Sequence, residues 1–327
     1  MGKSNIEVTK LVQEILNTKD IIENVQKHYE NNITLLDDMV SYGTEKIVQC
    51  FNISDRNIAD IVLLPTFSMK AMTMLDSIAI LLRNGAVYNA VIPTRILFEL
   101  SLYIEWILKS DTKERAKHYF AAEIRGDRLW ALRTISGSPE NQEFINKCKE
   151  FNFQKNRYDD IKKLAEEEVK NINEFLKSPA YKAINDMFDK LKGKKEYDPY
   201  WYKLSGIASI QDLAKKLNHA GQYNVFYAGQ SKKVHSNDMR SNVLLNEGVV
   251  SFKPIRNLND IHTVLNNSFS IWMEIMKMLI QKYIPDQMIE FNKTYIENWR
   301  GRFMNIPRYE ENFVQTISAE TKPETNS

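Results

Sequence analysis

The most apolar part of the chain runs from Met74 to Ser110. Between residues 86 and 109, apolar side chains occur at every helical phase, a pattern typical of a helix that its neighbours enclose on most sides. Pro93 lies inside this run, so the helix either kinks there or begins near Asn89 with the proline in its first turns. The stretch predicts a long, mostly buried central helix.

Helical periodicity continues through most of the remaining sequence. We interpret Ser54, Ser209 and Asn259 as helix N-caps, and Asn84-Gly85 and Gly137-Ser138-Pro139 as helix ends. Only residues 241–257 suggest short extended pieces. The expected helices cover residues 4–30, 33–51, 55–83, 86–109, 112–135, two stretches within 140–192, then 210–217, 222–237, 260–283 and 286–302. The predicted fold class is all-α, a multi-helix bundle.

Changes in composition suggest how the chain is organised. We expect N-terminal helices over 1–68 that pack on a helical core domain over 69–307, followed by a disordered polar tail over 308–327. Within the core, residues 140–196 are rich in Lys, Glu, Asp and Asn, and we interpret them as a charged, solvated helical insertion. Such a segment is also a possible surface for a protein partner.

Composition narrows the classes of function. The chain has 327 residues and a formal net charge of +2, which lacks the basic excess of dedicated nucleic-acid or membrane-surface binders. Charged residues interrupt every apolar run before a membrane span is complete, and the N-terminus shows no signal pattern. Cys50 and Cys148 have no pairing or metal-type spacing. We therefore expect a cytoplasmic protein without membrane partners.

Sequence motifs for several common kinds of binding and catalytic site are missing. Phosphate-cradling glycine patterns, HExxH, CxxC and GxSxG are all absent from the sequence. We accordingly predict neither a metal site nor a cofactor.

The central helix carries one pair of opposite charges, Arg95 and Glu99, at i,i+4 spacing. At about 100° per residue they share an arc with Glu105, and Trp106 lies beside them. The pair is either a structural salt bridge at the helix edge or the charged floor of a ligand-binding pocket.

A second candidate site centres on His235. Ser231 lies one helical turn earlier, so a hydroxyl and an imidazole can meet, and Tyr223 and Tyr227 precede them at helical spacing. Nothing in the sequence identifies an acid that would orient the imidazole, so a structural histidine and a site residue both remain possible.

A third candidate is the segment from Arg256 to His262, Arg-Asn-Leu-Asn-Asp-Ile-His. It resembles the RNxxxxH-type motif of the HEPN superfamily, helical bundles that include many metal-independent ribonucleases in which two motifs meet across a homodimer. In such an enzyme imidazole moves a proton and arginine stabilises phosphorane-like charge. The alternative is a helix-capping segment with Asn259 as the cap and His262 in the first turn.

A broader resemblance covers roughly residues 70–283. The order of an R-x-L-x-E-type helix, an E-R-A-x-x-Y segment and a tyrosine-rich helix ending S-x-x-x-H resembles an uncharacterised bacterial family catalogued as domain of unknown function five-six-seven-seven. The matching positions are Arg95, Glu99, Glu114, Arg115, Tyr119, Tyr223, Tyr227, Ser231 and His235. The resemblance implies an all-helical domain with a polar cluster at Arg95, Glu99 and His235, and it implies no activity.

Three functions remain after these exclusions. The first is a HEPN-like, metal-independent endoribonuclease acting on RNA in phage defence or growth arrest, with His262, Arg256 or His235 as catalytic residues and a homo-oligomeric assembly. The second is a non-enzymatic interaction module. The third is a sensor of a small anionic ligand, with Arg95, Glu99, Ser231 and Tyr227 lining the site.

Overall fold

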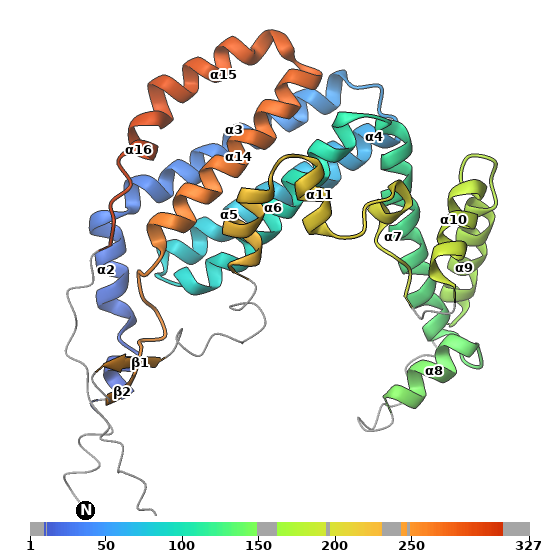
Figure 1. Ribbon diagram of the computed structural model, residues 1–327, viewed down its shortest axis with the longest axis horizontal. Coiled ribbons are helices and arrows are strands. Elements are labelled where there is room, and N and C mark those ends of the chain that lie inside the picture. The colour runs from blue at the N-terminus through green and yellow to red at the C-terminus, as the bar shows by residue number, and fades with distance from the viewer. Residues whose placement is uncertain are drawn as a thin grey trace, which may run out of the picture. The chain divides into compact units, whose positions relative to one another are not determined.

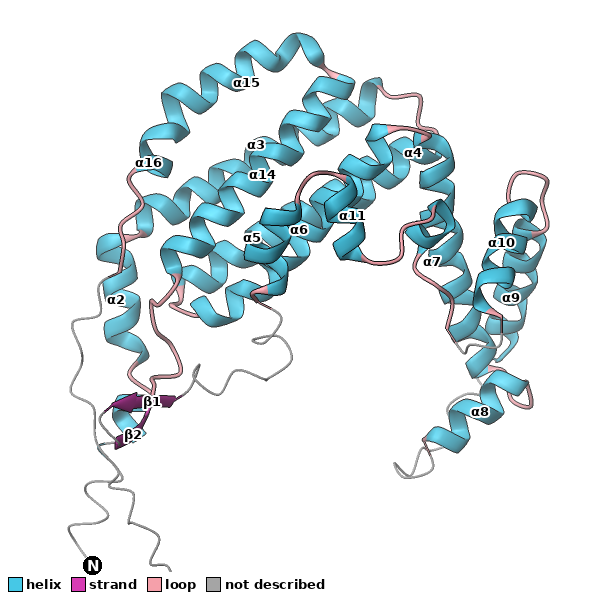
Figure 2. Cartoon of the chain, viewed as in Figure 1, coloured by secondary structure: helices cyan, strands magenta, loops and turns pink. Residues whose placement is uncertain are grey.

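The computed structural model describes residue 10 and residues 12–148, 162–193, 197–230, 243–246 and 249–309 (Figure 1). Figure 2 shows that helices make up nearly all of the regular structure in these residues. The predicted all-α fold is confirmed. Ser231 and His235 lie outside the described residues, as do residues 310–327 of the predicted disordered tail.

The chain divides into two compact units. Unit 1 comprises residues 1–55, 63–106 and 214–327, and unit 2 comprises residues 56–62 and 107–213. These units are groups of residues that contact one another, and each combines separate stretches of the chain. The sequence-based division into 1–68, 69–307 and 308–327 stays a prediction.

Unit 1 is built from long helices connected by short helical turns. Its elements are α2 (Thr18–His28), α3 (Glu30–Ile53), η1 (Val62–Ser68, which begins in unit 2), α5 (Met69–Arg83), most of α6 (Val87–Lys109), the end of α11 (Ile210–Lys216), α12 (Ala220–Gln222), η6 (Tyr223–Ala228), α14 (Ile261–Tyr283), η8 (Pro285–Gln287), α15 (Met288–Thr294), η9 (Tyr295–Trp299) and α16 (Arg300–Met304). Among the described residues, β1 (Val243–Asn246) pairs antiparallel with β2 (Val249–Phe252). This pairing confirms the extended pieces predicted for residues 241–257.

Helices α3, α5 and α14 pack together as the core of unit 1. Trp272 of α14 is fully buried, and its indole N–H donates to Met72 Sδ on α5 at 3.3 Å. Gly43 of α3 permits this approach, because a Cβ there would lie 2.5 Å from Met72 Sδ and 3.2 Å from Trp272 Nε1. The side-chain-free position therefore sets how closely the three helices pack.

The predicted central helix is confirmed as α6. Leu97, Phe98 and Ile104 are each at most 1% exposed, as expected of a helix with apolar residues at every phase. Pro93 lies inside the helix and not at its start.

Two predicted N-caps are wrong. Ser54 ends α3, and its N–H donates to the Cys50 and Phe51 carbonyls. The next cap is Asn57, whose side chain accepts from Asp60 N–H while the Asp60 carboxylate accepts from Asn57 N–H at 3.1 Å. This reciprocal capping box needs an acid three residues after the cap.

Residues at the start of α14 differ from the prediction in a similar way. Asn259 does not cap the helix: the N-cap position is Asp260, which forms no side-chain cap hydrogen bond, and the N–H of Asn259 donates to the Asn257 side chain at 3.2 Å. The helix begins at Ile261, after Asp260 has adopted a left-handed conformation with φ of 66°. Likewise, the single helix predicted over 4–30 is interrupted at Leu16–Asn17, where the Asn17 side chain donates to Asp20 Oδ2 at 2.7 Å.

Unit 2 consists of shorter, more polar helices. They are α4 (Ile58–Ile61), α7 (Thr112–Thr134), α8 (Pro139–Lys147), α9 (Lys162–Leu176), α10 (Lys182–Lys192), η5 (Trp201–Ser205) and the start of α11. The predicted break near Ser178-Pro179 is confirmed between α9 and α10. Ser138 and Ser209 accept hydrogen bonds from Asn141 N–H and Asp212 N–H at the starts of α8 and α11.

Unit 2 is connected internally through Arg125 of α7. This side chain is 1% exposed, and its guanidinium donates to Asp198 at 2.8 and 2.9 Å, to Asp189 at 2.8 Å and to Asn185. Burial alone would raise the pKa of Asp198, but the hydrogen bonds and charge of Arg125 hold that pKa below its ordinary value. One buried cation thus joins α7, α10 and the segment that precedes η5.

Among the described residues, one helical stretch, Ile58–Arg83, is long and apolar enough to cross a membrane by length and composition. More than half of its most apolar window, 56%, is buried inside the structure. A buried core helix of a globular protein passes the same test. Cys50 and Cys148 are both free thiols.

Candidate functional site

A polar seam in unit 1 runs along α6 where the segment 219–228 lies against it. His219 contacts Glu105, Phe226 contacts Phe98, and Tyr227 contacts Glu99. The start of the segment 219–228 contacts the C-terminal part of α6, and its end contacts residues nearer the middle of α6, so the two run antiparallel. Over the ten residues from Arg95 to Glu105 the seam extends about 15 Å.

At one end of the seam, Arg95 stacks on Tyr227. The guanidinium carbon lies 3.7 Å from the centre of the tyrosine ring, a cation–π contact. Arg95 Nη1 is buried and has no hydrogen-bond partner among the described residues. Gln230, three residues after Tyr227, likewise holds a buried side-chain oxygen with no partner in that part of the chain. Such donors and acceptors are rare in protein interiors, and each needs an explanation.

Glu99 does not form the ion pair with Arg95 that i,i+4 spacing predicts. Its two carboxylate oxygens instead accept from the hydroxyls of Tyr103 at 2.5 Å and Tyr227 at 3.4 Å. No ion pair between Arg95 and Glu99 occurs in the part of the chain that the structure describes. Burial is the main cause that raises the pKa of Tyr227, which keeps its hydroxyl protonated and able to donate. Arg95 is therefore left with unused donor capacity.

His219 is the residue that the sequence interpretation missed. Its Nε2 lies 2.6 Å from Glu105 Oε2, and its Nδ1 lies 2.9 Å from Gln222 Oε1. Both partners are oxygen atoms, so the arrangement favours the imidazolium, which donates from both nitrogens. The hydrogen bond to Glu105, opposed by partial burial, raises the pKa of His219, and the charge of Glu274 acts in the same direction.

The only sequence signal for this contact is the placement of Glu105 on the polar arc of α6. His219 follows Asn218, which adopts a left-handed conformation with φ of 65° after α11. That turn returns the chain toward α6, and the separation of 114 residues between the partners conceals the pairing in the sequence.

We predict that His219 makes unfolding pH-dependent. A raised folded-state pKa means that the stabilisation is complete below the unfolded value of about 6.5 and is lost as pH rises through the folded value. The free energy of unfolding of the wild type should therefore exceed that of His219→Gln most at about pH 5.5, and the difference should shrink by pH 8.5. Urea unfolding of both proteins at each pH measures it; a difference that grows with pH would contradict the imidazolium assignment.

Unit 2 holds a second buried histidine, His118 of α7. Its Nε2 lies 3.5 Å from Glu114 Oε1 and its Nδ1 lies 3.3 Å from Ser205 Oγ. Burial lowers the pKa of His118, so the imidazole is neutral at pH 7. With 5% of the residue exposed, the contact serves to hold η5 against α7.

Residues 60–248 match a family described as a family of unknown function (DUF5677). The chain belongs to this family. The assignment confirms the resemblance drawn from the motifs around Arg95, Glu114 and Tyr227, and it carries no activity. No curated protein and no solved structure matches the chain.

The DUF5677 region contains the whole polar seam. Arg95, Glu99, Glu105, His219 and Tyr227 all fall within residues 60–248. Ser231 and His235 fall within the same region and lie outside the described residues.

The HEPN-type segment lies beyond the DUF5677 region. Arg256 is partly exposed and donates from Nη1 to the Asn84 carbonyl at 3.1 Å. His262 lies in the first turn of α14 and is also partly exposed. Neither side chain contacts the polar seam in the described structure. Across the described residues, no group of three or more His, Cys, Asp and Glu side chains is arranged to hold a metal ion.

Proposed function

We propose that unit 1 binds a small ligand through an anionic phosphate or carboxylate group recognised by Arg95, and that the protein acts as a small-ligand sensor. The observation that carries the proposal is the buried Arg95 Nη1 without a partner. A charged donor left unsatisfied costs about 1–3 kcal/mol or more, and an anion that accepts from it recovers that energy.

The chemistry of the surroundings supports an anion over other ligands. Arginine presents paired N–H groups that match the oxygens of a phosphate or carboxylate. Glu99, the nearest acid on α6, is already bonded to two tyrosine hydroxyls and does not occupy the guanidinium. Since Tyr227 covers one face of Arg95, we infer that a ligand reaches Nη1 by shifting this ring.

Thermal unfolding in the presence of inorganic phosphate, AMP or citrate tests the proposal. A ligand that binds only the folded protein adds about 2.7 kcal/mol of stability at about 100 times its Kd. At least one of the three is expected to raise the Tm of the wild type and to leave the Tm of Arg95→Met unchanged. Equal shifts in both proteins, or no shift with any of the three, would contradict the proposal.

A metal-independent endoribonuclease is the second candidate, and the partial exposure of both Arg256 and His262 favours it. In this proposal His262 transfers the proton and Arg256 stabilises negative charge on the scissile phosphate, with the two motifs meeting across a homodimer that acts in phage defence or growth arrest. The cytoplasmic location is common to both candidates and stays a prediction.

The ribonuclease candidate predicts growth arrest with fragmented RNA in bacteria induced to express the wild type, and rescue by His262→Ala. His219→Gln serves as a matched control, because it alters a histidine of the seam and leaves the Arg256 segment intact. Arrest abolished by His235→Ala alone would transfer catalysis to the DUF5677 region. Intact RNA at full expression counts against catalysis.

A further inference from the structure

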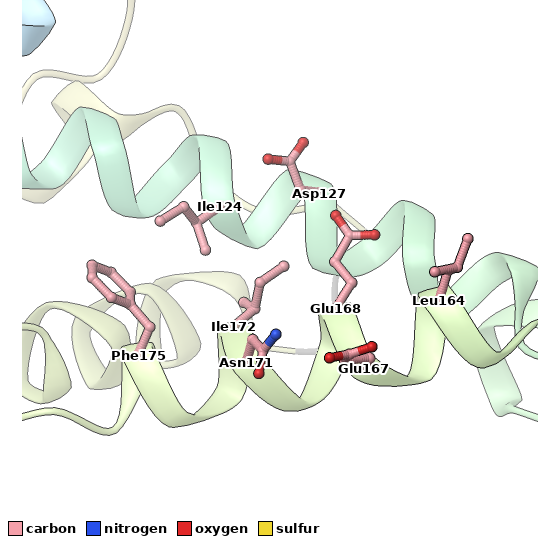
Figure 3. Close-up of a pocket in the computed structure, with 8 residues that line it drawn as sticks. All are labelled: Ile124, Asp127, Leu164, Glu167, Glu168, Asn171, Ile172 and Phe175. Atoms are coloured by element: carbon pink, nitrogen blue, oxygen red, sulfur yellow. The ribbon is translucent and has the colours of Figure 1, made fainter. Parts of the chain in front are cut away.

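Unit 2 contains a groove of about 580 Å³ between α7 and α9, distinct from the polar seam (Figure 3). Apolar and acidic side chains line it together. The lining residues are Ile124, Asp127, Leu164, Glu167, Glu168, Asn171, Ile172 and Phe175.

The apolar part of the groove is open to solvent at one end. Leu164, in the first turn of α9, is 67% exposed, and Ile172 and Phe175 continue the same side of the helix two and three turns later. A single exposed leucine is common on protein surfaces. At the end of an apolar groove, however, such a leucine provides apolar surface that a partner can bury on binding.

The acidic side chains of the groove are unpaired within the described part of the chain. Asp127, Glu167 and Glu168 form no ion pair with any described residue, whereas Glu166 of the same helix pairs with Lys162 at 3.8 Å. Figure 3 shows the Glu168 side chain reaching from α9 toward Asp127 on α7. Like charges brought together in this way repel, and a cationic partner relieves the repulsion.

The dimensions suit a helix of a partner protein. From Leu164 to Phe175 the groove follows α9 for eleven residues, about 16 Å or three helical turns. Helix-in-groove recognition uses apolar anchors at i, i+3, i+4 and i+7, a spacing that covers about two turns. The same negative charge disfavours nucleic acids and anionic membrane surfaces.

We propose that the α7–α9 groove docks a basic amphipathic helix of a partner protein. Apolar anchors of that helix cover Leu164 and Ile172, and its Lys or Arg side chains meet Asp127, Glu167 and Glu168. The proposal is independent of anion binding at Arg95, so failure of either leaves the other in place.

The probe is a fluorescent helical peptide of about 14 residues with Leu at i, i+3, i+4 and i+7 and Lys on the flanking positions, titrated with the full-length protein. We expect saturable binding that Glu168→Lys weakens about tenfold and Leu164→Gln about fivefold. Both positions are exposed, so neither change disturbs folding. A peptide with Glu in place of each Lys should not bind.

Glu174→Lys is the matched control, because Glu174 is an exposed acid of α9 that does not line the groove. Equal losses with Glu174→Lys and Glu168→Lys would show attraction to net charge alone and overturn the proposal. Unchanged binding by Leu164→Gln would also overturn it. A change in oligomeric state on Leu164→Gln, measured by analytical ultracentrifugation, would instead assign the groove to a second copy of the chain and contradict a heterologous partner.

Discussion

Arg95→Met is expected to weaken binding of a phosphate- or carboxylate-bearing ligand to unit 1 by at least about 100-fold. Two charge-assisted hydrogen bonds of about 1.5–3 kcal/mol each are lost, while the methionine keeps most of the apolar stem. The fold should tolerate the change, because the described contacts of Arg95 are with Tyr227, through its ring face and its hydroxyl, and Nη1 is unbonded among the described residues. Isothermal titration with the ligand that stabilises the wild type measures the loss.

Two further variants separate recognition from charge. Arg95→Lys keeps the positive charge and removes the paired N–H geometry, so we expect a loss of about tenfold. Arg302→Met removes an arginine that already pairs with Asp38 at 2.6 Å, and affinity should be unchanged. Equal affinity in Arg95→Met and the wild type would place the binding site elsewhere.

Arg125→Met is expected to lower the free energy of unfolding of unit 2 by about 3–5 kcal/mol. The substitution removes from Asp198, whose side chain is 20% exposed, its closest cation and leaves Lys192 at 3.7 Å as the remaining ion-pair partner. It also removes the hydrogen bonds that join α7 to Asp189 and Asn185. Urea unfolding followed by circular dichroism measures the change, and hydrogen exchange of α7 and α10 peptides assigns it to unit 2.

The control for Arg125→Met is again Arg302→Met, which removes an exposed ion pair. We expect it to lower the free energy of unfolding by about 0–1 kcal/mol. The deficit of Arg125→Met should also shrink in acid, because Asp198 has a depressed folded-state pKa and its ionised form contributes stability only above it. Comparable stability of the two variants at pH 7 would contradict the central role of Arg125.

The fold was predictable where the signal is local. Apolar residues at every phase predicted the buried helix α6, and Gly85 with φ of 68° and the Ser209 cap marked helix boundaries as expected. Ser138, predicted as part of a helix end, also caps the helix that follows. Ser54 and Asn57 are both good caps, and only the acid at position 60 decides between them. Local sequence patterns thus predict well where a helix lies, but they do not decide which of two neighbouring residues begins it.

The candidate site was predictable only in part, because its contacts join distant segments. The polar arc of α6 nominated Arg95 and Glu99, but i,i+4 spacing favoured an ion pair that two tyrosine hydroxyls replace. The sequence does not show that His219 pairs with Glu105 or Arg125 with Asp198, since 114 and 73 residues separate the partners. The spacing of residues along one helix does not show which side chains of other segments will compete for the same hydrogen bonds.

Anion recognition at Arg95 is tested most directly by observing its guanidinium with nuclear magnetic resonance while the nitrogen-15-labelled protein is titrated with inorganic phosphate. The Nε–Hε signal of Arg95 is identified by its loss in Arg95→Lys. We predict that this signal shifts progressively and saturates with phosphate, while the signal of Arg302 stays in place. An Arg95 signal that does not move, at phosphate concentrations that shift other arginines, would contradict anion recognition at Arg95.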